Sequence, residues 1–249
     1  VEGRVDPVAD VETINTELLL ADMETVDKAI DRYGRRAKSN DKTAIAMRDA
    51  LRSMAEGLDA GEPIRAQTLD DSGREVLGEL HLLTAKPVLY VANVNEEGLG
   101  GNAALAQLEQ LAARENARVV PVCAAIEAEL SQLDEDERNE LLAAYDLDEP
   151  GLNRVIRAGY ALLSLQTFFT AGPKEVRAWT VTEGATAPEA ASRIHSDIQR
   201  GFIRAEVIAV DEYLSAGGEQ AAKEAGRMRL EGKEYIMRDG DVCHFRFNV

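Results

Sequence analysis

Two polar residues at a spacing of three, Asn93 and Glu96, carry the side chains best suited to recognising a nucleotide base. The Asn93 carboxamide can both donate and accept hydrogen bonds, whereas an ionised Glu96 carboxylate only accepts. Together they can match donors and acceptors along the edge of a purine. Residues 93–96 also fit a plain turn after a strand, with polar groups in water. On these four residues alone the turn is favoured, because short motifs recur by chance.

The strand that must position these side chains is an apolar run, 87–92, rich in β-branched and aromatic residues. Such a run predicts a strand buried on both faces of a parallel sheet. In open α/β sheets ligands bind at the carboxyl ends of the strands, which is where Asn93 and Glu96 fall. Gly100 and Gly101 follow as a flexible loop. No lysine with serine or threonine comes after them, so they do not form a phosphate-binding loop.

A second apolar run predicts a strand at 118–125, and Asn102 should cap the helix between the two strands. A strand, helix and strand in this order form a right-handed crossover, so both strands end at one edge of the sheet. Upstream, a capping box at 72–75 predicts the start of a helix that leads to the first strand. Further helices are predicted from Asp134 to about Tyr145 and over 151–163.

Two long helices are predicted before these elements. Apolar residues recur at alternating spacings of three and four over 19–37, and again over 44–58, after a polar break at 39–40. Each series is a helical stripe, and two stripes joined by a short break predict an antiparallel helical hairpin. The stripes should form the core of that hairpin. Asp10 is placed to cap the first helix.

Five cations crowd the turn of this hairpin, where the single acid is Asp41. In a chain of net charge −17 they form a local basic patch. The patch fits contact with RNA, and it fits equally a solvated helix end, because cations are favourable near a helix carboxyl terminus. The candidate contact residues are Arg32, Arg35, Arg36, Lys38 and Lys42.

The last third of the chain changes character. Strands are predicted at 175–181 and 202–210, with a helix at 189–199 between them. Asp239 and Gly240, between two alternating runs, predict a β-hairpin. Strands flanking one helix in about 80 residues are typical of a small β-grasp, ubiquitin-like α+β module. Six basic residues are candidates for one basic face of this module: Arg193, Arg200, Arg204, Arg227, Arg229 and Lys233.

Composition narrows the class of protein. The 249 residues hold 45 acidic and 28 basic side chains, which favours solubility and argues against indiscriminate attraction to nucleic acid. No apolar run approaches the roughly 18 residues that span a bilayer, and no signal peptide is seen, so we expect a cytoplasmic protein without a membrane partner. Cys123 and Cys243 fall in predicted strands and are not expected to form a disulfide. No pair of the three histidines has metal-ligand spacing, and no metal site is predicted.

The chain resembles a known family over its whole length. Residues 93–96, Asn-Val-Asn-Glu, stand where GTPases of the P-loop class carry the guanine-specifying motif Asn-Lys-x-Asp at the end of a strand. The altered motif is similar to that of the Obg-related YchF family of P-loop NTPases, an ATP-preferring branch. The longest block that carries the resemblance is 166–180, and another is 1–10.

The resemblance implies a multidomain fold of the α/β and α+β classes. Residues 1–10 and 64–164 would form the carboxyl-terminal part of a P-loop nucleotide-binding domain. Residues 11–63 would form a helical-hairpin, coiled-coil insertion, and 165–249 a β-grasp TGS domain. In the family a helical insertion of this kind accompanies ribosome association, and TGS domains recur in proteins that act on RNA or ribosomes. We therefore expect the hairpin turn to contact RNA or the ribosome, and we expect a monomer.

The resemblance also implies roles for individual residues and a ligand. The ligand of the intact protein would be ATP, or GTP, with Mg²⁺. Residues 123–125 resemble the last base-contacting loop of GTPases, Ser-Ala-Lys, in which backbone amides face the base. The nucleotide base would be contacted by Asn93, Val94, Glu96, Cys123, Ala124 and Ala125.

The motifs that bind phosphate in this class are absent from the 249 residues, which contain no G-x-x-x-x-G-K-[ST] and no D-x-x-G-like switch segment that follows such a loop. In the family these elements lie before the block that begins at Val1. We therefore expect the chain to be a fragment or a processed product that is inactive alone, whereas the intact protein would be an ATPase or GTPase. The alternative is a non-enzymatic RNA- or ribosome-binding adaptor.

Overall fold

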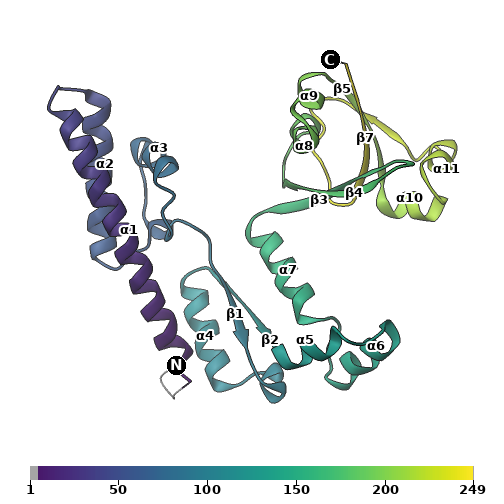
Figure 1. The fold of residues 1–249 in the computed structure, drawn as a ribbon, viewed down its shortest axis with the longest axis horizontal. Coiled ribbons are helices and arrows are strands. Elements are labelled where there is room, and N and C mark those ends of the chain that lie inside the picture. Colours follow the sequence, from purple (N-terminus) through teal and green to yellow (C-terminus); the bar gives the residue numbers. More distant parts are fainter. Residues whose placement is uncertain (1–4, 249) are drawn as a thin grey trace. The chain divides into compact units, whose positions relative to one another are not determined.

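The computed structural model describes residues 5–248 as a mixed α/β chain (Figure 1). It falls into two compact units, Val1–Ala158 and Gly159–Val249. Residues 1–4 and 249, with which the first and last predicted domains begin and end, lie outside the described residues. The three-domain assignment stays a prediction. Within residues 5–248 no helix combines the length and the apolar character that crossing a bilayer requires.

The first unit begins with two packed helices, α1 (Pro7–Ala37) and α2 (Lys42–Asp59), joined by a short turn as the stripes predict. Val26 and Tyr33 on α1 and Leu51 on α2 are at most 2% exposed. Burying a large apolar side chain of this kind contributes roughly 1.5–3 kcal/mol, so packing of the two stripes stabilises both helices. After α2 the chain forms η1 (Ile64–Ala66) and α3 (Asp71–Leu80).

Two predicted helix starts are wrong by a few residues. Asp6, and not Asp10, caps α1: its side chain accepts the Ala9 N–H at 3.2 Å. Pro7 allows this earlier start, because proline lacks an N–H and its fixed φ suits the first helical turn. Likewise Asp70 caps α3 by accepting the Gly73 N–H at 2.7 Å, so the helix begins before the predicted box at 72–75.

A parallel pair of strands follows. β1 (Leu89–Asn93) pairs with β2 (Arg118–Val122) from Leu89 opposite Arg118 to Asn93 opposite Val122. Between them lie η2 (Glu96–Gly100) and α4 (Ala103–Arg114), which is capped by Asn102 as predicted. The prediction that β1 is buried on both faces is wrong. Val91 is 52% exposed, because among the described residues β1 has β2 as its single neighbouring strand.

The second predicted strand ends earlier than expected. β2 stops at Val122, and Ala124 already begins a helix. The predicted capping box at Asp134 is present: its side chain accepts the Glu137 N–H at 3.0 Å. The remaining helices of this unit are α5 (Ala124–Leu130), α6 (Glu135–Ala144) and α7 (Gly151–Leu162), within which the division between the units falls.

The second unit is built on a mixed sheet that, in the described residues, has five strands in the order β4-β3-β7-β5-β6. β7 lies between β3, to which it is parallel, and β5, to which it is antiparallel. The strands are β3 (Leu165–Ala171), β4 (Val176–Thr182), β5 (Phe202–Ala209), β6 (Arg229–Glu231) and β7 (Asp241–Phe247). The helices are α8 (Ala187–Ile194), α9 (Ser196–Arg200), α10 (Val210–Ala216) and α11 (Glu219–Glu224).

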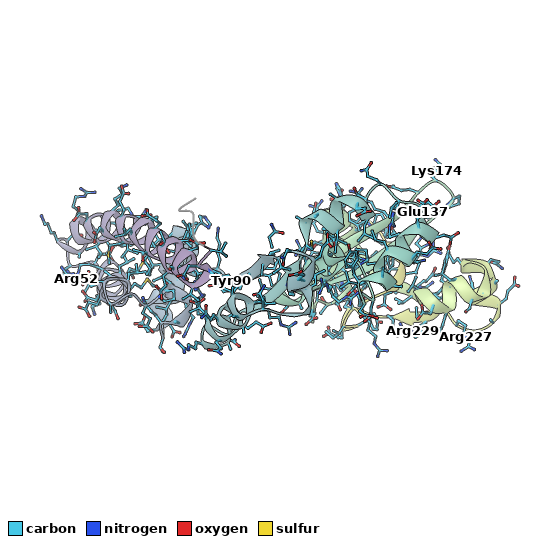
Figure 2. The ribbon with its side chains drawn as sticks, turned by 90° about the horizontal axis from the view of Figure 1, so that it is seen from below. Arg52, Tyr90, Glu137, Lys174, Arg227 and Arg229 are labelled. Carbon is cyan, nitrogen blue, oxygen red and sulfur yellow. The ribbon has the colours of Figure 1, made fainter. Side chains whose placement is uncertain are left out.

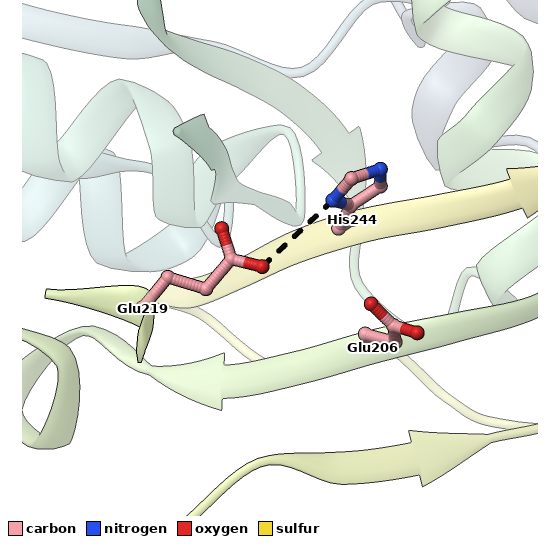
Figure 3. Close-up of side chains that lie close together, drawn as sticks. All are labelled: Glu206, Glu219 and His244. Atoms are coloured by element: carbon pink, nitrogen blue, oxygen red, sulfur yellow. Dashed lines mark ion pairs between the residues drawn. The ribbon is translucent and has the colours of Figure 1, made fainter. Parts of the chain in front are cut away.

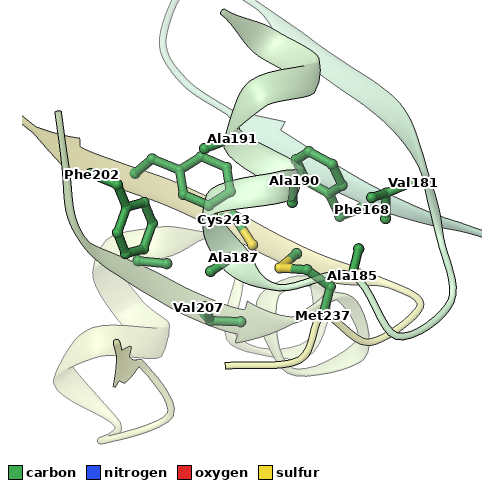
Figure 4. Packing of buried hydrophobic residues seen from close by; sticks show 12 residues of the cluster. Phe168, Val181, Ala185, Ala187, Ala190, Ala191, Phe202, Val207, Met237 and Cys243 are labelled. Atoms are coloured by element: carbon green, nitrogen blue, oxygen red, sulfur yellow. The ribbon is translucent and has the colours of Figure 1, made fainter. Parts of the chain in front are cut away.

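The core of this unit lies between the sheet and α8 (Figure 4). Phe168 and Phe245 meet edge to face with ring centroids 5.9 Å apart, and Ala190 allows α8 to approach the sheet. Burial raises the pKa of the Cys243 thiol well above its ordinary value, so this cysteine is a small core residue. Cys123 is also free and buried.

Two predictions for this unit are wrong. The expected helix 189–199 is broken at His195, whose ring nitrogen accepts the Asp197 N–H at 3.1 Å and caps α9. The expected hairpin at Asp239 and Gly240 is not formed. The Asp239 carboxylate accepts the Thr167 N–H at 2.8 Å, so this turn joins β3, and β7 enters the sheet beside β3 and β5.

Candidate functional site

Asn93 and Ala124 meet where β1 and β2 end. The Ala124 N–H donates to Asn93 Oδ1 at 3.2 Å, although the two residues are 31 positions apart. The parallel register explains the contact, because Asn93 lies opposite Val122, and the Val94 N–H continues the pairing to the Val122 carbonyl at 2.9 Å. With Oδ1 occupied, the exposed Asn93 amide presents its NH₂ as a donor.

Glu96 is an exposed residue at the start of η2, three positions after Asn93. The Asn95 side chain caps this short helix by accepting the Gly98 N–H at 3.0 Å. Gly98 has no room for a side chain, because a Cβ atom there would lie 2.9 Å from Asn102 Nδ2 and 3.0 Å from the Val94 Cβ. The side chains of Val94, Asn95 and Asn102 thus pack closely against Gly98 and fix the turn that carries Glu96.

Residues 123–125 start α5 and do not extend the strand. Cys123 is the N-cap residue of α5 and is 4% exposed, while Ala124 and Ala125 are exposed at the first helical turn. The Cys123 side chain makes no capping hydrogen bond, and the carboxamide of Asn93 satisfies the Ala124 N–H in its place. The predicted base-contacting residues of both strand ends therefore lie at one edge.

One residue near this edge was missed from the sequence. Tyr145 is the C-cap residue of α6, and the Glu96 carboxylate nearby raises the pKa of its phenol. Its ring packs against the apolar cluster of Cys123, Ile126, Leu130 and Leu142. An aromatic residue after a helix carries no signal that links it to Glu96, since their proximity depends on how three separate elements pack.

The hairpin is joined to β1 through a cluster around Glu115. The Tyr90 hydroxyl donates to Glu115 Oε2 at 2.6 Å, Asn15 on α1 donates to Oε1 at 3.3 Å, and Arg65 lies 3.6 Å from Oε2. Burial, with the Glu115 hydrogen bond, raises the pKa of Tyr90, which is labelled in Figure 2, to about 12. Its phenol therefore stays protonated as a donor. Through Glu115, α1 is thereby connected to the strand that ends in Asn93.

A second connection uses a buried carboxylate. Asp22 on α1 is 2% exposed, and its two oxygens accept the Leu83 N–H at 2.8 Å and the Thr84 N–H at 2.7 Å. The Thr84 hydroxyl in turn accepts the Ile64 N–H at 3.1 Å. The segment that leads into β1 is thus held against the hairpin by charge-assisted hydrogen bonds.

The five cations of the hairpin turn are all exposed, but they are not equally available. Arg32 pairs with Glu79 at 3.0 Å and Arg36 with Asp41 at 3.4 Å, and both guanidinium groups lie over the Tyr33 ring. Within residues 5–248 the other three have no acidic partner within ion-pair distance. These available cations are Arg35, Lys38 and Lys42.

Comparison with known proteins identifies the family. The chain is similar to proteins named ribosome-binding ATPase YchF, from Haemophilus influenzae at 53% identity and from Bacillus subtilis at 50%. Each comparison covers 100% of this chain and 69% of the relative. The chain belongs to the YchF family. Residues 165–248 also match the family model YchF-GTPase_C, described as a protein of unknown function (DUF933).

Solved structures agree with this assignment. The YchF GTPase of Schizosaccharomyces pombe matches with a TM-score of 0.84 and 30% sequence identity, over 99% of this chain and 68% of that one. A GTP-binding protein from Pyrococcus horikoshii matches with a TM-score of 0.60 over 98% of this chain and 72% of that one. At 18% identity, this second likeness concerns the fold alone.

The second unit of this YchF chain brings together Glu206, Glu219 and His244, whose ligand atoms lie within 4.8 Å of one another (Figure 3). Strand pairing explains the proximity, since Glu206 lies opposite His244. Both Glu206 oxygens, however, already accept hydrogen bonds from Arg246, at 3.1 and 2.9 Å. We therefore assign the Glu206 carboxylate to this ion pair and place no metal there.

The basic face predicted for the second unit is largely neutralised. Arg227 pairs with Glu212 at 3.3 Å, and Arg229 pairs with the buried Asp241 at 3.2 Å. Both arginines are labelled in Figure 2. Arg200 and Arg204 also have acidic neighbours within ion-pair distance. The available cations of the hairpin turn are therefore the stronger candidates for contact with RNA.

Proposed function

We propose that this chain recognises the nucleotide base and contacts the ribosome as part of a nucleotide-dependent switch, with ATP preferred over GTP and hydrolysed by the intact protein. The observation that carries the proposal is the hydrogen bond from the Ala124 N–H to Asn93 Oδ1, which joins the two predicted base-contacting segments. The names of the relatives, ribosome-binding ATPase, support both parts of it.

The arrangement of hydrogen-bonding groups suits adenine. The Asn93 NH₂ group donates to the acceptor N7, which every purine offers. The Glu96 carboxylate accepts from the exocyclic N6 amine of adenine. Guanine carries an acceptor oxygen at that position, so the same carboxylate repels it. The Ala124 N–H is bonded to Asn93 Oδ1 and holds that carboxamide in place, so the Ala125 N–H, in the first turn of α5, is the backbone donor that we expect to face the base.

A direct test is the conversion of Glu96 to the shorter aspartate in the full-length protein. Glu96→Asp should shift the ratio of ATP to GTP affinity toward guanine by at least roughly tenfold, because a hydrogen bond to a charged group contributes about 1.5–3 kcal/mol. Dissociation constants for both nucleotides would be measured by calorimetry. Glu97→Asp, at the neighbouring exposed position, is the matched control. An unchanged ratio for Glu96→Asp would refute the base assignment.

Binding of the nucleotide phosphates requires groups other than the base-contacting residues named above. These 249 residues contain no glycine-rich loop with lysine and serine or threonine for the phosphates and Mg²⁺. Charge-assisted hydrogen bonds to phosphate usually dominate nucleotide affinity. We therefore expect the 249-residue chain alone to show no ATP hydrolysis and no micromolar ATP binding. A micromolar dissociation constant by calorimetry would contradict this.

The hairpin turn is the proposed contact with ribosomal RNA. Charge reversal of Arg35, Lys38 and Lys42 to glutamate should abolish co-sedimentation with ribosomes and flatten its salt dependence, since each lost phosphate contact lowers the salt slope by about one. The control reverses three cations elsewhere in the first unit: Lys28, Arg52 and Arg74. Equal loss in both triple variants would show a general charge effect and count against the turn.

A non-enzymatic adaptor is the second candidate, favoured by the missing phosphate-binding motifs. The two functions differ in one measurement. A switch requires that ribosome affinity of the full-length protein differ between its ATP-bound and nucleotide-free forms, because a ligand shifts an equilibrium only through differential affinity. An adaptor should bind equally well in both forms.

A further inference from the structure

β4 forms one edge of the sheet in the second unit and, among the described residues, has β3 as its single neighbouring strand (Figure 1). Natural edge strands are usually short, bulged or covered, because their unpaired backbone groups can bind another strand. The opposite edge follows this rule, since β6 has three residues. β4 does not, because its seven residues pair with β3 in an unbroken register, from Leu165 opposite Thr182 to Ala171 opposite Val176.

The pairing with β3 fixes which backbone groups of β4 face outward. At one end the Gly172 N–H donates to the Glu175 carbonyl at 2.9 Å. At the other end the Glu183 N–H donates to the Ser164 carbonyl at 2.7 Å. Because hydrogen-bonded and non-hydrogen-bonded pairs alternate along an antiparallel ladder, the odd-numbered residues of β4 bond to β3. The even-numbered residues therefore point their N–H and C=O groups to the free edge.

Three even-numbered residues keep both groups unpaired within residues 5–248. The fourth, Thr182, already accepts the Ala185 N–H at 3.1 Å. The other three are exposed and uncharged, and they are Val176, Ala178 and Thr180. Val176 is 73% exposed. This edge therefore offers three N–H donors and three C=O acceptors in a row to an added strand.

The side chains on the other face of β4 are a cation and an aromatic ring. The Arg177 guanidinium carbon lies 4.2 Å from the centre of the Trp179 ring. Trp179 is opposite the buried Phe168, so this pair is on the side of the sheet that α8 covers. An added strand would meet the small side chains of residues 176, 178 and 180 on one face, and this pair on the other.

The free groups of β4 are complementary to those of a second β4. Two copies related by a two-fold axis pair antiparallel and present the same surface to each other. In the register centred on Ala178, this residue faces its own counterpart, and Val176 faces Thr180 of the partner subunit. This register pairs all three free residues of each copy. Three N–H donors from each strand give six hydrogen bonds across the interface.

Charge favours the same register. It places Arg177 opposite Trp179 of the partner subunit, at a distance where a cation–π contact is favourable. A register centred on Arg177 would bring two guanidinium groups opposite each other. A register centred on Trp179 would bring Glu175 opposite Glu183. Like charges directly opposite are destabilising, so both neighbouring registers are disfavoured.

We propose that β4 is a self-association surface, at which a second copy of this chain adds its own β4 antiparallel and continues the sheet across a two-fold axis. One strand pair is a small interface, so the expected dissociation constant is on the order of 100 μM. The monomer expected from the sequence is then the dilute form. Because each copy carries a net charge of −17, screening by salt should strengthen the dimer.

Sedimentation velocity of the 249-residue chain, from about 10 to about 500 μM, tests the proposal. The dimer fraction should rise with concentration and, at a fixed concentration, with salt. Ala178→Lys should weaken the dimer roughly fivefold, because two like charges then face each other. Ala178→Pro should weaken it by at least roughly tenfold, because the central N–H donor is lost from both copies. Its missing N–H is not used by β3, so the fold should tolerate proline at this edge.

The matched control is Leu230→Lys, which makes the same change of charge at an exposed position of β6. This variant should dimerise like the parent. Equal weakening by Ala178→Lys and Leu230→Lys, or a dimer that weakens with salt, would overturn the proposal. A parent that stays monomeric at the highest concentration would refute a second copy as the partner and leave this edge to a strand from another protein.

Cysteine crosslinking tests the register. Cys123 and Cys243 are 4% and 3% exposed, so an introduced surface cysteine is the reactive thiol. Ala178→Cys should form a covalent dimer with a short bismaleimide, because the two copies of this residue face each other. Thr182→Cys is the control, since its two copies would be eight residues apart along the strands, or roughly 26 Å. Equal crosslinking of both variants, or none with Ala178→Cys where the dimer forms, would refute the register.

Discussion

Replacing Asp22 with alanine should selectively destabilise the first unit. This carboxylate is 2% exposed and is the acceptor for two backbone N–H groups, those of Leu83 and Thr84, at 2.8 and 2.7 Å. Alanine leaves both donors without their partner, and of the two the Thr84 N–H is buried. The variant therefore removes the connection between α1 and the segment leading to β1 without changing an exposed surface.

The magnitude follows from the number of donors left unpaired. Each buried polar group that loses its partner costs about 1–3 kcal/mol, and the Leu83 N–H is only partly buried, so we expect a loss of about 3 kcal/mol. For a urea dependence of about 2 kcal/mol per M, the midpoint falls by roughly 1.5 M. Asp27→Ala, at an exposed position of the same helix, should stay within about 0.5 kcal/mol.

Unfolding of the two units can be followed separately, because the single tryptophan lies in the second unit. Trp179, the single tryptophan, lies in β4 of the second unit, whereas the long helices of the first unit dominate the circular dichroism at 222 nm. In urea titrations of Asp22→Ala the helical transition should move and the tryptophan fluorescence transition should not. Equal midpoints for Asp22→Ala and Asp27→Ala would refute the assigned role. A matching shift of the tryptophan transition would show that the effect is not local.

Two further predictions concern the second unit and use the melting temperature read from tryptophan fluorescence. The hydrogen bond with Arg246 lowers the pKa of Glu206 below its ordinary value of 4.5. The stability this pair contributes is present above that value and lost as pH falls through the folded-state pKa, so Glu206→Gln should weaken the acid-side decline; an unaltered decline would contradict this. Burial, with the hydrogen bond to Asp241, raises the pKa of Tyr235 from 10.0 to about 12, and its stabilisation is present below pH 10 and lost between pH 10 and 12. Tyr235→Phe should cost about 1–2 kcal/mol at neutral pH and remove that alkaline decline, whereas a parent-like profile would refute the assignment.

Local chemistry made several elements predictable. Asn102 and Asp134 cap helices as expected, because the cap and the donors it satisfies are three residues apart. The stripes over 19–37 and 44–58 predict the hairpin correctly, because each stripe can be buried only against the other. In each case the deciding pattern is local, because a cap acts across three residues and the apolar residues of each stripe recur every three or four residues.

The errors arise where a distant segment decides the structure. Asp239 and Gly240 form a turn, as such a pair should, but the strand that follows pairs with β3 and β5, which provide a longer set of partners than residues 235–238. The contact between Asn93 and Ala124 could be anticipated from the meeting of two parallel strand ends. Tyr145 could not, because its place depends on the packing of α6.

The length of α1 limits how the proposed base site at Asn93 and the proposed ribosome contact at the hairpin turn can influence each other. Asn15, which is tied to the strand ending in Asn93, lies 22 residues before Ala37 at the end of the helix, or roughly 33 Å at 1.5 Å per residue. Charges in physiological salt are screened over about 8 Å. Four screening lengths separate the two places, so the charge of a bound nucleotide has no direct effect on the cations of the turn. Any influence of one site on the other must therefore pass through a displacement of α1, which is held to the rest of the first unit at Asn15 and Asp22.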